Sequence, residues 1–355
     1  MSKARITIRD VAKAAGVSLG TASRALNRAG RVSEGAIVAV TKAARTLGYE
    51  PDAVAQSMRT RSTGAVGLLV SDFSNPLYAH IINAVEARMQ AAGYALLLAN
   101  THNNAKREKG LIDLFRRRRV DGLILCPCAG ESPKMLDELA TELAVVGIDR
   151  DLSSTNTGVQ VDHFHGAMQA TRYLLDLGHT DIALLTPGVT LRPGRERIAG
   201  FEDAYRDRGL KPTPRLIRGE RSAMEFAFSE ALSLMSSPGA PTAFLCLGTR
   251  ILSGVLQAIR HSGQTIPEEI SVIGIGDTDL SRLFSPAITS LTWDLDAVGS
   301  AAAELLLKRL DQEEEAEPER VIITTQLVLR ESCSPARQGP GRPGGAHARF
   351  ARSSS

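Results

Sequence analysis

The stretch TIRDVAKAAGVSLGTASRALN, residues 7–27, constrains the fold of this chain more than any other segment. Apolar residues recur at helical spacing in its first half, which predicts a helix over residues 8–15. Gly16 suits a tight turn, because glycine adopts a positive φ without steric cost. Ser18 is a favourable N-cap for a second helix over residues 19–26. We therefore expect two short helices joined by a turn.

The second of these helices carries short hydrogen-bond donors and one long cation, namely Thr21, Ser23, Arg24 and Asn27. Such a set suits the major groove of DNA, where short donors contact phosphates and an arginine reads guanine edges. An ordinary helical hairpin with solvated polar side chains is the alternative. The coincidence of turn, cap and donors in one register favours the DNA-binding interpretation.

The distribution of charge agrees with this interpretation. Residues 1–61 contain eleven Lys or Arg and four Asp or Glu, whereas the whole chain has a formal net charge of only +3. The remainder of the chain is therefore acidic. A basic head on a mildly acidic body is typical of a nucleic-acid-binding module joined to a second function.

The length and composition predict a large core and two or three domains, since 43% of the 355 residues are hydrophobic. The first residues have no apolar signal segment, and no apolar run is long enough to span a membrane, so we expect a cytoplasmic, nucleoid-associated protein. The cysteines lack paired CxxC spacing, and we interpret them as reduced thiols with no metal and no cofactor. They are Cys126, Cys128, Cys246 and Cys333.

Beyond the basic head, apolar runs alternate with helical patterns in the manner of a doubly wound α/β fold with two lobes. The runs expected to be strands are residues 65–71, 95–99, 122–126, 144–148, 181–185, 243–247 and 271–275. The helical patterns lie near residues 77–92, 105–118, 165–177, 195–208, 223–235 and 251–262. A strand and helix over residues 288–310, a final strand over 321–329 and a disordered tail from residue 334 complete the expectation.

Several motifs in this order resemble bacterial transcriptional regulators of the lactose/galactose-repressor (LacI/GalR) family, from about residue 5 to 332. The motifs include VSEGAIVAVTKAARTLGYEPDAVAQSM, SDFSNPLY, RRRRVDGLIL, LGHTDIALL, RERIAGF, IPEEISVIGIGD and LVLRES. The resemblance implies an all-α helix-turn-helix head joined to an α/β core of two doubly wound lobes like periplasmic binding proteins. It also implies a homodimer that binds a palindromic operator.

The implied division is a helix-turn-helix domain over residues 1–48, a hinge helix over 49–63, a ligand-binding core over 64–333 and a tail over 334–355. Within the core, one lobe would comprise residues of about 64–163 and 293–322. The other lobe would comprise residues of about 164–292 and 323–333.

The resemblance also assigns DNA contacts position by position. Leu19, Gly20 and Arg24 fall where the family reads base edges. Positions that face phosphates or nearby bases are Thr7, Ser18, Thr21, Ser23, Asn27 and Arg31. Met58 falls where the family inserts an apolar wedge into the minor groove, and Ala55 falls where two hinge helices approach closely.

The effector cleft implied by the family lies between the lobes. Its expected contacts are Asp72, Leu77, Tyr78, Asp149, Arg197, Arg221, Arg250 and Asp277. Two signatures of sugar binding are replaced, since Gly248-Thr249-Arg250 stands for an Asn-Asp and Gly276-Asp277 for an Asp-Asp. Arg221 stands where some relatives stack an aromatic ring on the sugar.

Several guanidinium groups in one cleft repel each other unless an anion or an acid neutralises them. The sequence therefore favours a sugar acid or sugar phosphate as effector, with a neutral sugar as the alternative. Arg221 or Arg250 could instead point outward or pair with a nearby aspartate.

Two other function classes are disfavoured. A transport-binding protein would share the core but would carry a signal peptide and no DNA-binding head. An enzyme is disfavoured because no GxGxxG follows the first strand, and no P-loop or GxSxG is present. His163 and His165 are interpreted as surface histidines. The sequence thus predicts a non-enzymatic, ligand-responsive repressor of a carbohydrate or sugar-acid catabolic operon.

Overall fold

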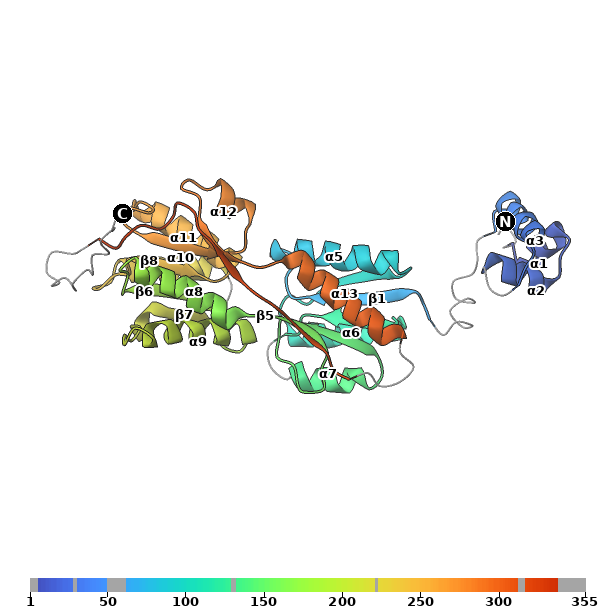
Figure 1. The fold of residues 1–355 in the computed structure, drawn as a ribbon, viewed down its shortest axis with the longest axis horizontal. Helices are drawn as coiled ribbons and strands as arrows, with labels where there is room; N and C mark the ends of the chain where they lie inside the picture. The colour runs from blue at the N-terminus through green and yellow to red at the C-terminus, as the bar shows by residue number, and fades with distance from the viewer. Residues whose placement is uncertain are drawn as a thin grey trace, which may run out of the picture. The chain divides into compact units, whose positions relative to one another are not determined.

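The computed structural model describes residues 6–27, 31–49, 62–128, 132–220, 223–311 and 317–337. The chain divides into two compact units, Met1–Gly64 and Ala65–Ser355. The first unit is helical, and the second holds two parallel sheets covered by helices (Figure 1). These findings confirm the predicted fold class of a helix-turn-helix head and a two-lobed α/β core.

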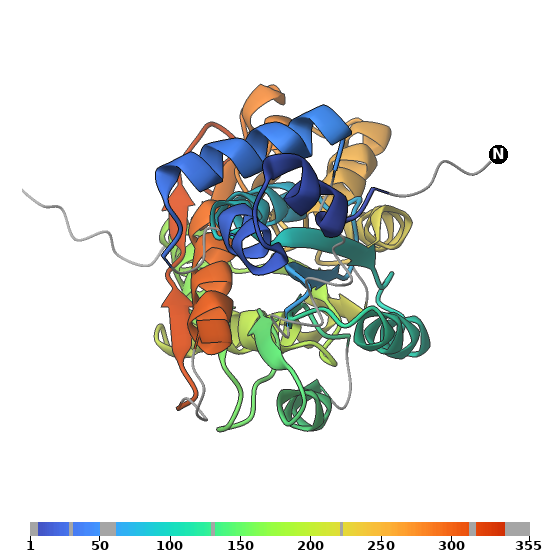
Figure 2. The same ribbon diagram turned by 90° about the vertical axis from the view of Figure 1, so that its right-hand side faces the viewer.

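Three helices form the first unit: α1 (Ile8–Ala15), α2 (Leu19–Leu26) and α3 (Glu34–Leu47). The bounds of α1 and α2 are those predicted, because local signals define both ends of each helix. Gly16 has a φ of 65° at the turn, and Ser18 caps α2 by accepting a hydrogen bond from the Thr21 N–H at 3.1 Å. The three helices pack against one another (Figure 2), and their shared core includes Val11, Ala22 and Val40.

The N-lobe is built on a sheet of order β11-β5-β4-β3-β1-β2. Its strands are β1 (Ala65–Val70), β2 (Ala95–Asn100), β3 (Gly122–Leu125), β4 (Ala144–Ile148), β5 (Gly158–Val161) and β11 (Arg320–Ile323). Its helices are α5 (Leu77–Ala91), α6 (Ala105–Arg117), α7 (Ser132–Ala140) and α13 (Leu295–Asp311). All strand pairs in this sheet are parallel, with β1 between β2 and β3.

The C-lobe has a second sheet of order β12-β10-β9-β8-β6-β7. Its strands are β6 (Ile182–Pro187), β7 (Ile217–Glu220), β8 (Ala243–Cys246), β9 (Ser271–Ile275), β10 (Thr289–Thr292) and β12 (Gln326–Val328). Its helices are α8 (His163–Asp176), α9 (Arg192–Arg206), α10 (Met224–Met235), α11 (Thr249–Ser262) and α12 (Asp279–Leu283), with a short 3-10 turn at Pro214–Leu216. Helix α8 packs against α9, and α10 packs against α11.

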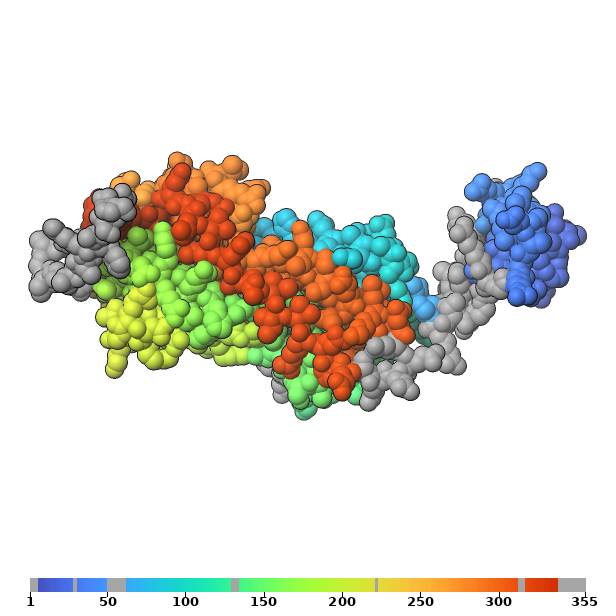
Figure 3. Space-filling model, viewed as in Figure 1, coloured from blue at the N-terminus to red at the C-terminus, as the bar shows by residue number. Residues whose placement is uncertain are grey.

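The chain passes between the lobes at three places in the described residues: from β5 to α8, from β10 to α13, and from β11 to β12. The last passage corrects the prediction of one strand over residues 321–329. β11 pairs in parallel with β5, whereas β12 pairs antiparallel with β10, so the chain changes sheet between them. Figure 3 shows this C-terminal segment lying across both lobes.

Two other differences from the sequence prediction concern short or polar segments. β5, β7 and α12 were not predicted because each has only four or five residues, and α7 was missed although Leu136 and Leu139 lie at helical spacing. Ser334 and Ala336, which the composition placed in a disordered tail, are bonded to the C-lobe. The Ser334 hydroxyl donates to the Pro267 carbonyl at 2.8 Å, and the Ala336 N–H donates to the Leu177 carbonyl at 2.8 Å.

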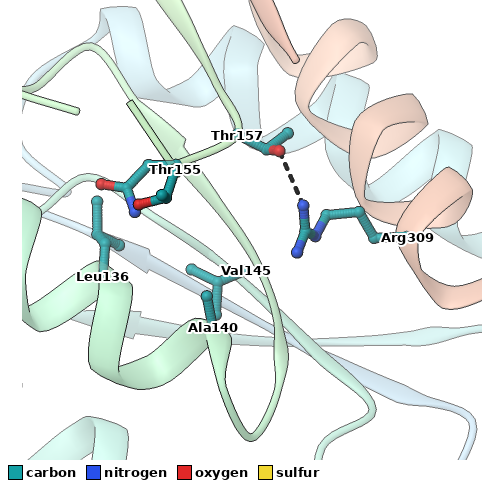
Figure 4. A pocket seen from close by; sticks show the side chains of 7 residues that line it. Leu136, Ala140, Val145, Thr155, Thr157 and Arg309 are labelled. Carbon is teal, nitrogen blue, oxygen red and sulfur yellow. Dashed lines mark hydrogen bonds between the residues drawn. The ribbon is translucent and has the colours of Figure 1, made fainter. Parts of the chain in front are cut away.

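The side chains around a small hollow between α7, β4 and α13 attach α13, the last helix, to the N-lobe (Figure 4). Arg309 donates from Nη1 to the hydroxyl of Thr157 at 2.9 Å. Leu136, Ala140 and Val145 form the apolar side of the hollow. Its volume of about 10 Å³ leaves no room for an effector, so we interpret it as a packing feature.

Candidate functional site

The outer face of α2 is the candidate DNA interface. Ala22 and Ala25 are buried against the other helices, which leaves Leu19, Gly20 and Arg24 exposed. Gly20 lies one helical turn before Arg24 and has no side chain to contact it. This geometry leaves Arg24 available to a base edge.

The residues expected to face phosphates have mixed environments. Ser18 and Arg31 are exposed, whereas Thr21 and Ser23 are half-buried. Thr7 donates from its hydroxyl to the Asp10 carboxylate at 2.7 Å. Asn27 ends α2 and donates from Nδ2 to the Ser23 carbonyl at 2.5 Å, so its amide is part of the helix terminus. Ala55 and Met58 lie outside the described residues.

A cavity of about 450 Å³ lies between the two lobes of the core. It lies at the ends of several parallel strands, where α/β folds bind ligands. Six of the expected effector contacts line it: Asp72, Leu77, Tyr78, Asp149, Arg197 and Arg250. Arg221 lies outside the described residues.

One wall of this cavity is apolar. Side chains from both lobes form it, including Val161, Ile275, Trp293 and Val298. Trp293, the single tryptophan of the chain, follows β10 and packs edge-to-face on the His163 ring with ring centroids 5.5 Å apart. The cavity thus combines an apolar surface with a small set of charged groups.

His163 connects the charged groups, and its position corrects the expectation of a surface histidine. Its side chain is fully buried, whereas His165 is exposed and pairs with Asp162. The Arg197 guanidinium donates from Nη2 to Nδ1 of His163 at 3.2 Å. His163 therefore carries its proton on Nε2 and donates to the Asp149 carboxylate at 2.9 Å.

Burial and the positive charge of Arg197 lower the pKa of His163, although Asp149 opposes this shift. Burial raises the pKa of Asp149, but His163, Arg150 and Arg197 lower it by more, so the carboxylate stays ionised. These pKa shifts leave the imidazole of His163 neutral, between the Asp149 carboxylate and the Arg197 guanidinium. It keeps Asp149 and Arg197 in place without adding a second charge.

Asp149 receives further contacts from both lobes. From its own lobe, the Val161 N–H donates to Oδ1 of Asp149 at 3.3 Å. Arg192, at the start of α9, donates from Nη1 to its carboxylate at 3.4 Å and also pairs with Glu196 at 2.8 Å. Asp149 has a φ of 52°, a left-handed conformation that is uncommon for residues other than glycine. Such strain is typical of a functional site.

Arg197 is 6% exposed and belongs to the RERIAGF motif on α9. It donates from Nη1 to the Leu247 carbonyl at 2.8 Å, but its buried Nε has no hydrogen-bond partner within the described part of the chain. Burial lowers its pKa to about 10, so the group stays charged at neutral pH. Its charge and its place in the lining of the cavity make Arg197 a candidate ligand contact.

Tyr78 is engaged on the N-lobe side of the cavity. Its hydroxyl lies 2.7 Å from the Ser71 hydroxyl and 3.1 Å from the Cys126 sulfur. Burial raises the pKa of both Tyr78 and Cys126, so the phenol and the thiol are neutral at physiological pH. Cys126 therefore behaves as a small buried group and not as a reactive thiolate.

Contacts across the mouth of the cavity hold the lobes together. Asp72 accepts from the N–H and hydroxyl of Ser74, and Arg250 donates from Nη1 to the same hydroxyl at 2.9 Å. Thr249 donates to the side-chain oxygen of Asn75 at 3.2 Å. An open hollow of about 440 Å³ adjoins the cavity here, since Ser71, Asp72, Asn103 and Arg250 line both.

Asp277 takes a different place from the one expected. It is not among the residues that line the cavity, and its carboxylate pairs with Arg282 at 3.0 Å and with Arg330. Arg330 also donates to the Ile288 carbonyl at 2.8 Å, which ties the C-terminal segment to the sheet. In this conformation the ion pairs of Asp277 therefore stabilise the C-lobe.

The adjacent Gly276 has a φ of 80°, and a Cβ there would lie 2.6 Å from Leu77 of the N-lobe.

Among the residues of this site that sequence reasoning missed are Arg150, His163, Arg192 and Trp293. The signal for Trp293 was available, since it is a lone tryptophan directly after an apolar run. The other three acquire their roles only when distant elements meet. No spacing rule identifies such residues.

The geometry is that of a helix-turn-helix head joined to a two-lobed receptor core, which defines a class of ligand-controlled transcription regulators. Residues 7–52 match the family described as bacterial regulatory proteins, lacI family, and residues 171–333 match the periplasmic binding protein-like domain. The chain is 34% identical over 331 residues to the HTH-type transcriptional repressor PurR of Pasteurella multocida (strain Pm70), covering 92% of this chain and 98% of that protein. It is 35% identical over 329 residues to the PurR repressor of Histophilus somni (strain 129Pt), with the same coverage.

Solved structures agree with this assignment. The Lac repressor dimer bound to operator and the anti-inducer ONPF is similar with a TM-score of 0.82 and 25% identity, covering 93% of this chain and 100% of that one. The transcriptional regulator CelR–cellobiose complex is similar with a TM-score of 0.70 and 28% identity, covering 92% and 100%. The chain belongs to the lacI family of bacterial regulatory proteins, which are DNA-binding transcriptional repressors.

Two searches of the described residues gave no candidate. No group of histidine, cysteine, aspartate and glutamate side chains there has the arrangement of a metal site. No helix in the same ranges combines the length and the apolar character that crossing a membrane requires.

Proposed function

We propose that this chain is a homodimeric repressor whose affinity for an inverted-repeat operator is set by an anionic small molecule bound between the lobes. The observation that carries the proposal is the interlobe cavity, which the buried Arg197 lines together with Asp149 and Arg250. The protein acts by binding and catalyses no reaction. Its place is the cytoplasm, at the nucleoid, where its operator lies.

Ligand control follows from the origin of the residues that line the cavity. Asp72, Tyr78 and Asp149 come from the N-lobe, whereas Arg197 and Arg250 come from the C-lobe. A ligand that contacts both groups binds best in one arrangement of the lobes. Such differential affinity is what allows a ligand to shift a conformational equilibrium.

The charged groups support an anionic ligand, and the apolar wall around Trp293 supports a flat or apolar body on the same molecule. The curated relatives reported above carry the name PurR, so they do not support the earlier expectation of a sugar catabolic operon. Among the neighbours reported above, the CelR complex does contain a sugar, cellobiose. We therefore retain the anionic group as the defining feature and test sugars together with their acid and phosphate forms.

The DNA-binding proposal rests on the exposed Arg24 and on the short α2 helix. One recognition helix of eight residues contacts too few base pairs for specificity in a genome, so two half-sites are needed. The hinge over residues 49–63, with Ala55 and the Met58 wedge, completes the proposal but lies largely outside the described residues. Met58→Ala should weaken specific binding and reduce DNA bending, as a gel-phasing assay would show.

The second copy is proposed to dock along β2, an edge strand of the N-lobe sheet. Its Leu97 and Leu98 are 37% and 41% exposed. An edge strand with adjacent exposed leucines favours association with another chain. Leu98→Glu should shift the protein toward monomer in sedimentation experiments, whereas Leu114→Glu on α6 is the control.

Selection of operator sequences from a random DNA pool tests the whole proposal. Enriched sites should be inverted repeats, and affinity should fall steeply as salt increases, because the basic head displaces counterions. Binding of a monomer to a single half-site without salt dependence would contradict the proposal. Repeating the titration with each candidate ligand then shows whether the ligand releases or promotes DNA binding.

A further inference from the structure

Four consecutive arginines, Arg116–Arg119, stand at the C-terminal end of α6 in the N-lobe, and the proposed function does not use them. All four are exposed. Buried Phe115 and Val120 flank them, and the Val120 N–H donates to the Phe115 carbonyl at 3.2 Å. The backbone of this arginine cluster is therefore fixed on the core of the N-lobe, whereas its side chains are in solvent.

The arginine cluster lies at the edge of the sheet where the strands of the N-lobe begin. It directly precedes β3, which starts at Gly122 and pairs in parallel with β1. The Asp121 N–H donates to the carbonyl of Ala65 at 2.7 Å, and Ala65 is the first residue of the core unit. The cluster is therefore within a few residues of the point at which the chain enters the core from the helix-turn-helix unit.

Cations at the ends of other N-lobe helices already have local partners. A helix that precedes a parallel strand ends at the edge where that strand begins, so α5 and α13 end at this same edge. Arg88 in the last turn of α5 pairs with Glu304 at 3.1 Å, and Lys308 in the last turn of α13 pairs with Glu319. These two cations need no external partner.

Arg117 and Arg118 differ from them. Their neighbour Arg116 pairs with Glu142, but no acidic oxygen of the described residues lies within 4.0 Å of either Arg117 or Arg118. The C-terminus of a helix carries only about half of a negative elementary charge, so it compensates for little of this positive charge. The two guanidinium groups are therefore available to an anion outside the chain.

DNA is the polyanion that this protein brings close to the arginine cluster. Residues 48–64 connect α3 to the core, and a chain of that length spans at most about 60 Å whatever its conformation. A duplex bound by α2 is thus held within reach of Arg117 and Arg118. It presents a phosphate charge about every 1.7 Å along its axis, and guanidinium groups suit phosphate oxygens.

We propose that Arg117 and Arg118 contact phosphates of the duplex outside the half-site that α2 binds, so that the core binds DNA together with the helix-turn-helix unit. The inference goes beyond the proposed function, in which the core only binds the effector. Because phosphates carry no sequence information, this contact adds affinity but no sequence preference. It makes operator binding depend on the length of the flanking DNA.

Equilibrium binding of the full-length protein to two duplexes tests the proposal. Both carry the operator obtained by selection, and they extend beyond it by about 3 and about 15 base pairs on each side, the latter being about 50 Å. The long duplex should bind roughly three- to tenfold more tightly at low salt, as expected for a few exposed ion pairs. Its affinity should also fall more steeply with salt, by about 0.9 in the logarithmic slope for each phosphate contact.

The double variant Arg117→Gln/Arg118→Gln should lose most of the advantage of the long duplex and the additional salt dependence. Its Tm and its affinity for the short duplex should stay near those of wild type, because both side chains are exposed. The matched control is Lys211→Gln/Arg260→Gln, which removes two exposed cations from the C-lobe and gives the same net charge. This control should keep the full advantage of the long duplex.

The proposal is overturned if the wild-type protein binds both duplexes equally, a result that does not depend on any variant. It is also overturned if the arginine variant keeps the advantage of the long duplex, or if the control loses it to the same extent. A change in sedimentation of the arginine variant, with flank dependence intact, would assign the cluster to a protein partner and refute the DNA contact.

The same titrations separate this inference from the proposed function. Specific binding without flank dependence refutes only the contact of Arg117 and Arg118. Absence of specific binding to either duplex refutes the proposed function itself.

Discussion

The Nε2 atom of His163 lies 2.9 Å from the Oδ2 atom of Asp149, and this hydrogen bond joins the two lobes of the core. His163 begins α8 of the C-lobe, whereas Asp149 follows β4 of the N-lobe. The other ring nitrogen accepts from Arg197. The same imidazole therefore orients a charged group of the interlobe cavity and bridges the two lobes.

Replacing this imidazole should impair both stability and ligand binding. His163→Ala removes an acceptor from Arg197 and a donor from Asp149, and leaves two buried charges with fewer partners. We expect the free energy of unfolding to fall by about 1–3 kcal/mol and ligand affinity to fall at least tenfold. Urea unfolding and thermal-shift titration would measure the two effects. The exposed His165→Ala is the control, and an equal loss in both variants would argue against the bridging role.

The stability of the protein should decrease as the pH falls below neutrality. Burial lowers the pKa of His163 to about 4 and also lowers the pKa of His179, whereas an unfolded histidine titrates near 6.5. Between these values the unfolded state binds more protons than the folded state, so the free energy of unfolding rises with pH. In that window His163 contributes up to about 1.4 kcal/mol per pH unit, and His179 adds a slope of the same sign. Urea unfolding from pH 7 to pH 4.5 should show this slope, and His163→Ala should reduce it.

Much of the fold could be predicted because its signals are local. Both helices of the DNA-binding motif begin and end where the cap at Ser18 and the turn at Gly16 indicate. The buried strands are continuous apolar runs, which parallel sheets require. β7 could not be predicted in this way, because the edge strand Ile217–Glu220 has only one large apolar residue.

The site was less predictable than the fold. Arg197 could be placed in the cavity because it lies in a motif, but the role of His163 arises from residues 149 and 197, which are distant in the sequence. The change of sheet after Ile323 is likewise invisible in the sequence, since the same apolar alternation continues on both sides of it. Asp277 shows the converse case. The resemblance assigns its carboxylate to the ligand, but in the structure this carboxylate pairs with Arg282 and Arg330.

The packing of α8 on α9 depends on a glycine of the RERIAGF motif. A Cβ at Gly200 would lie 2.1 Å from the carbonyl oxygen of Phe164, so Gly200→Ala forces the helices apart. We expect a loss of about 1–3 kcal/mol in the free energy of unfolding, as for other overpacked sites. Gly110→Ala on α6 is the matched control, since a Cβ there meets no atom within 4 Å. That control should stabilise the protein by about 0.5–1 kcal/mol, because alanine favours a helix.

The last prediction concerns how the exposed arginine of α2 reads DNA. If Arg24 contacts a guanine edge, Arg24→Ala should cost about 1–3 kcal/mol of operator affinity and relax the preference at one position of each half-site. Arg45→Ala, which removes an equal charge from the exposed surface of α3, is the control for electrostatics alone. It should weaken binding to all sequences alike and leave the preferred site unchanged. Operator selection with both variants distinguishes the two roles, and identical site preferences for wild type and Arg24→Ala would show that this arginine supplies only charge.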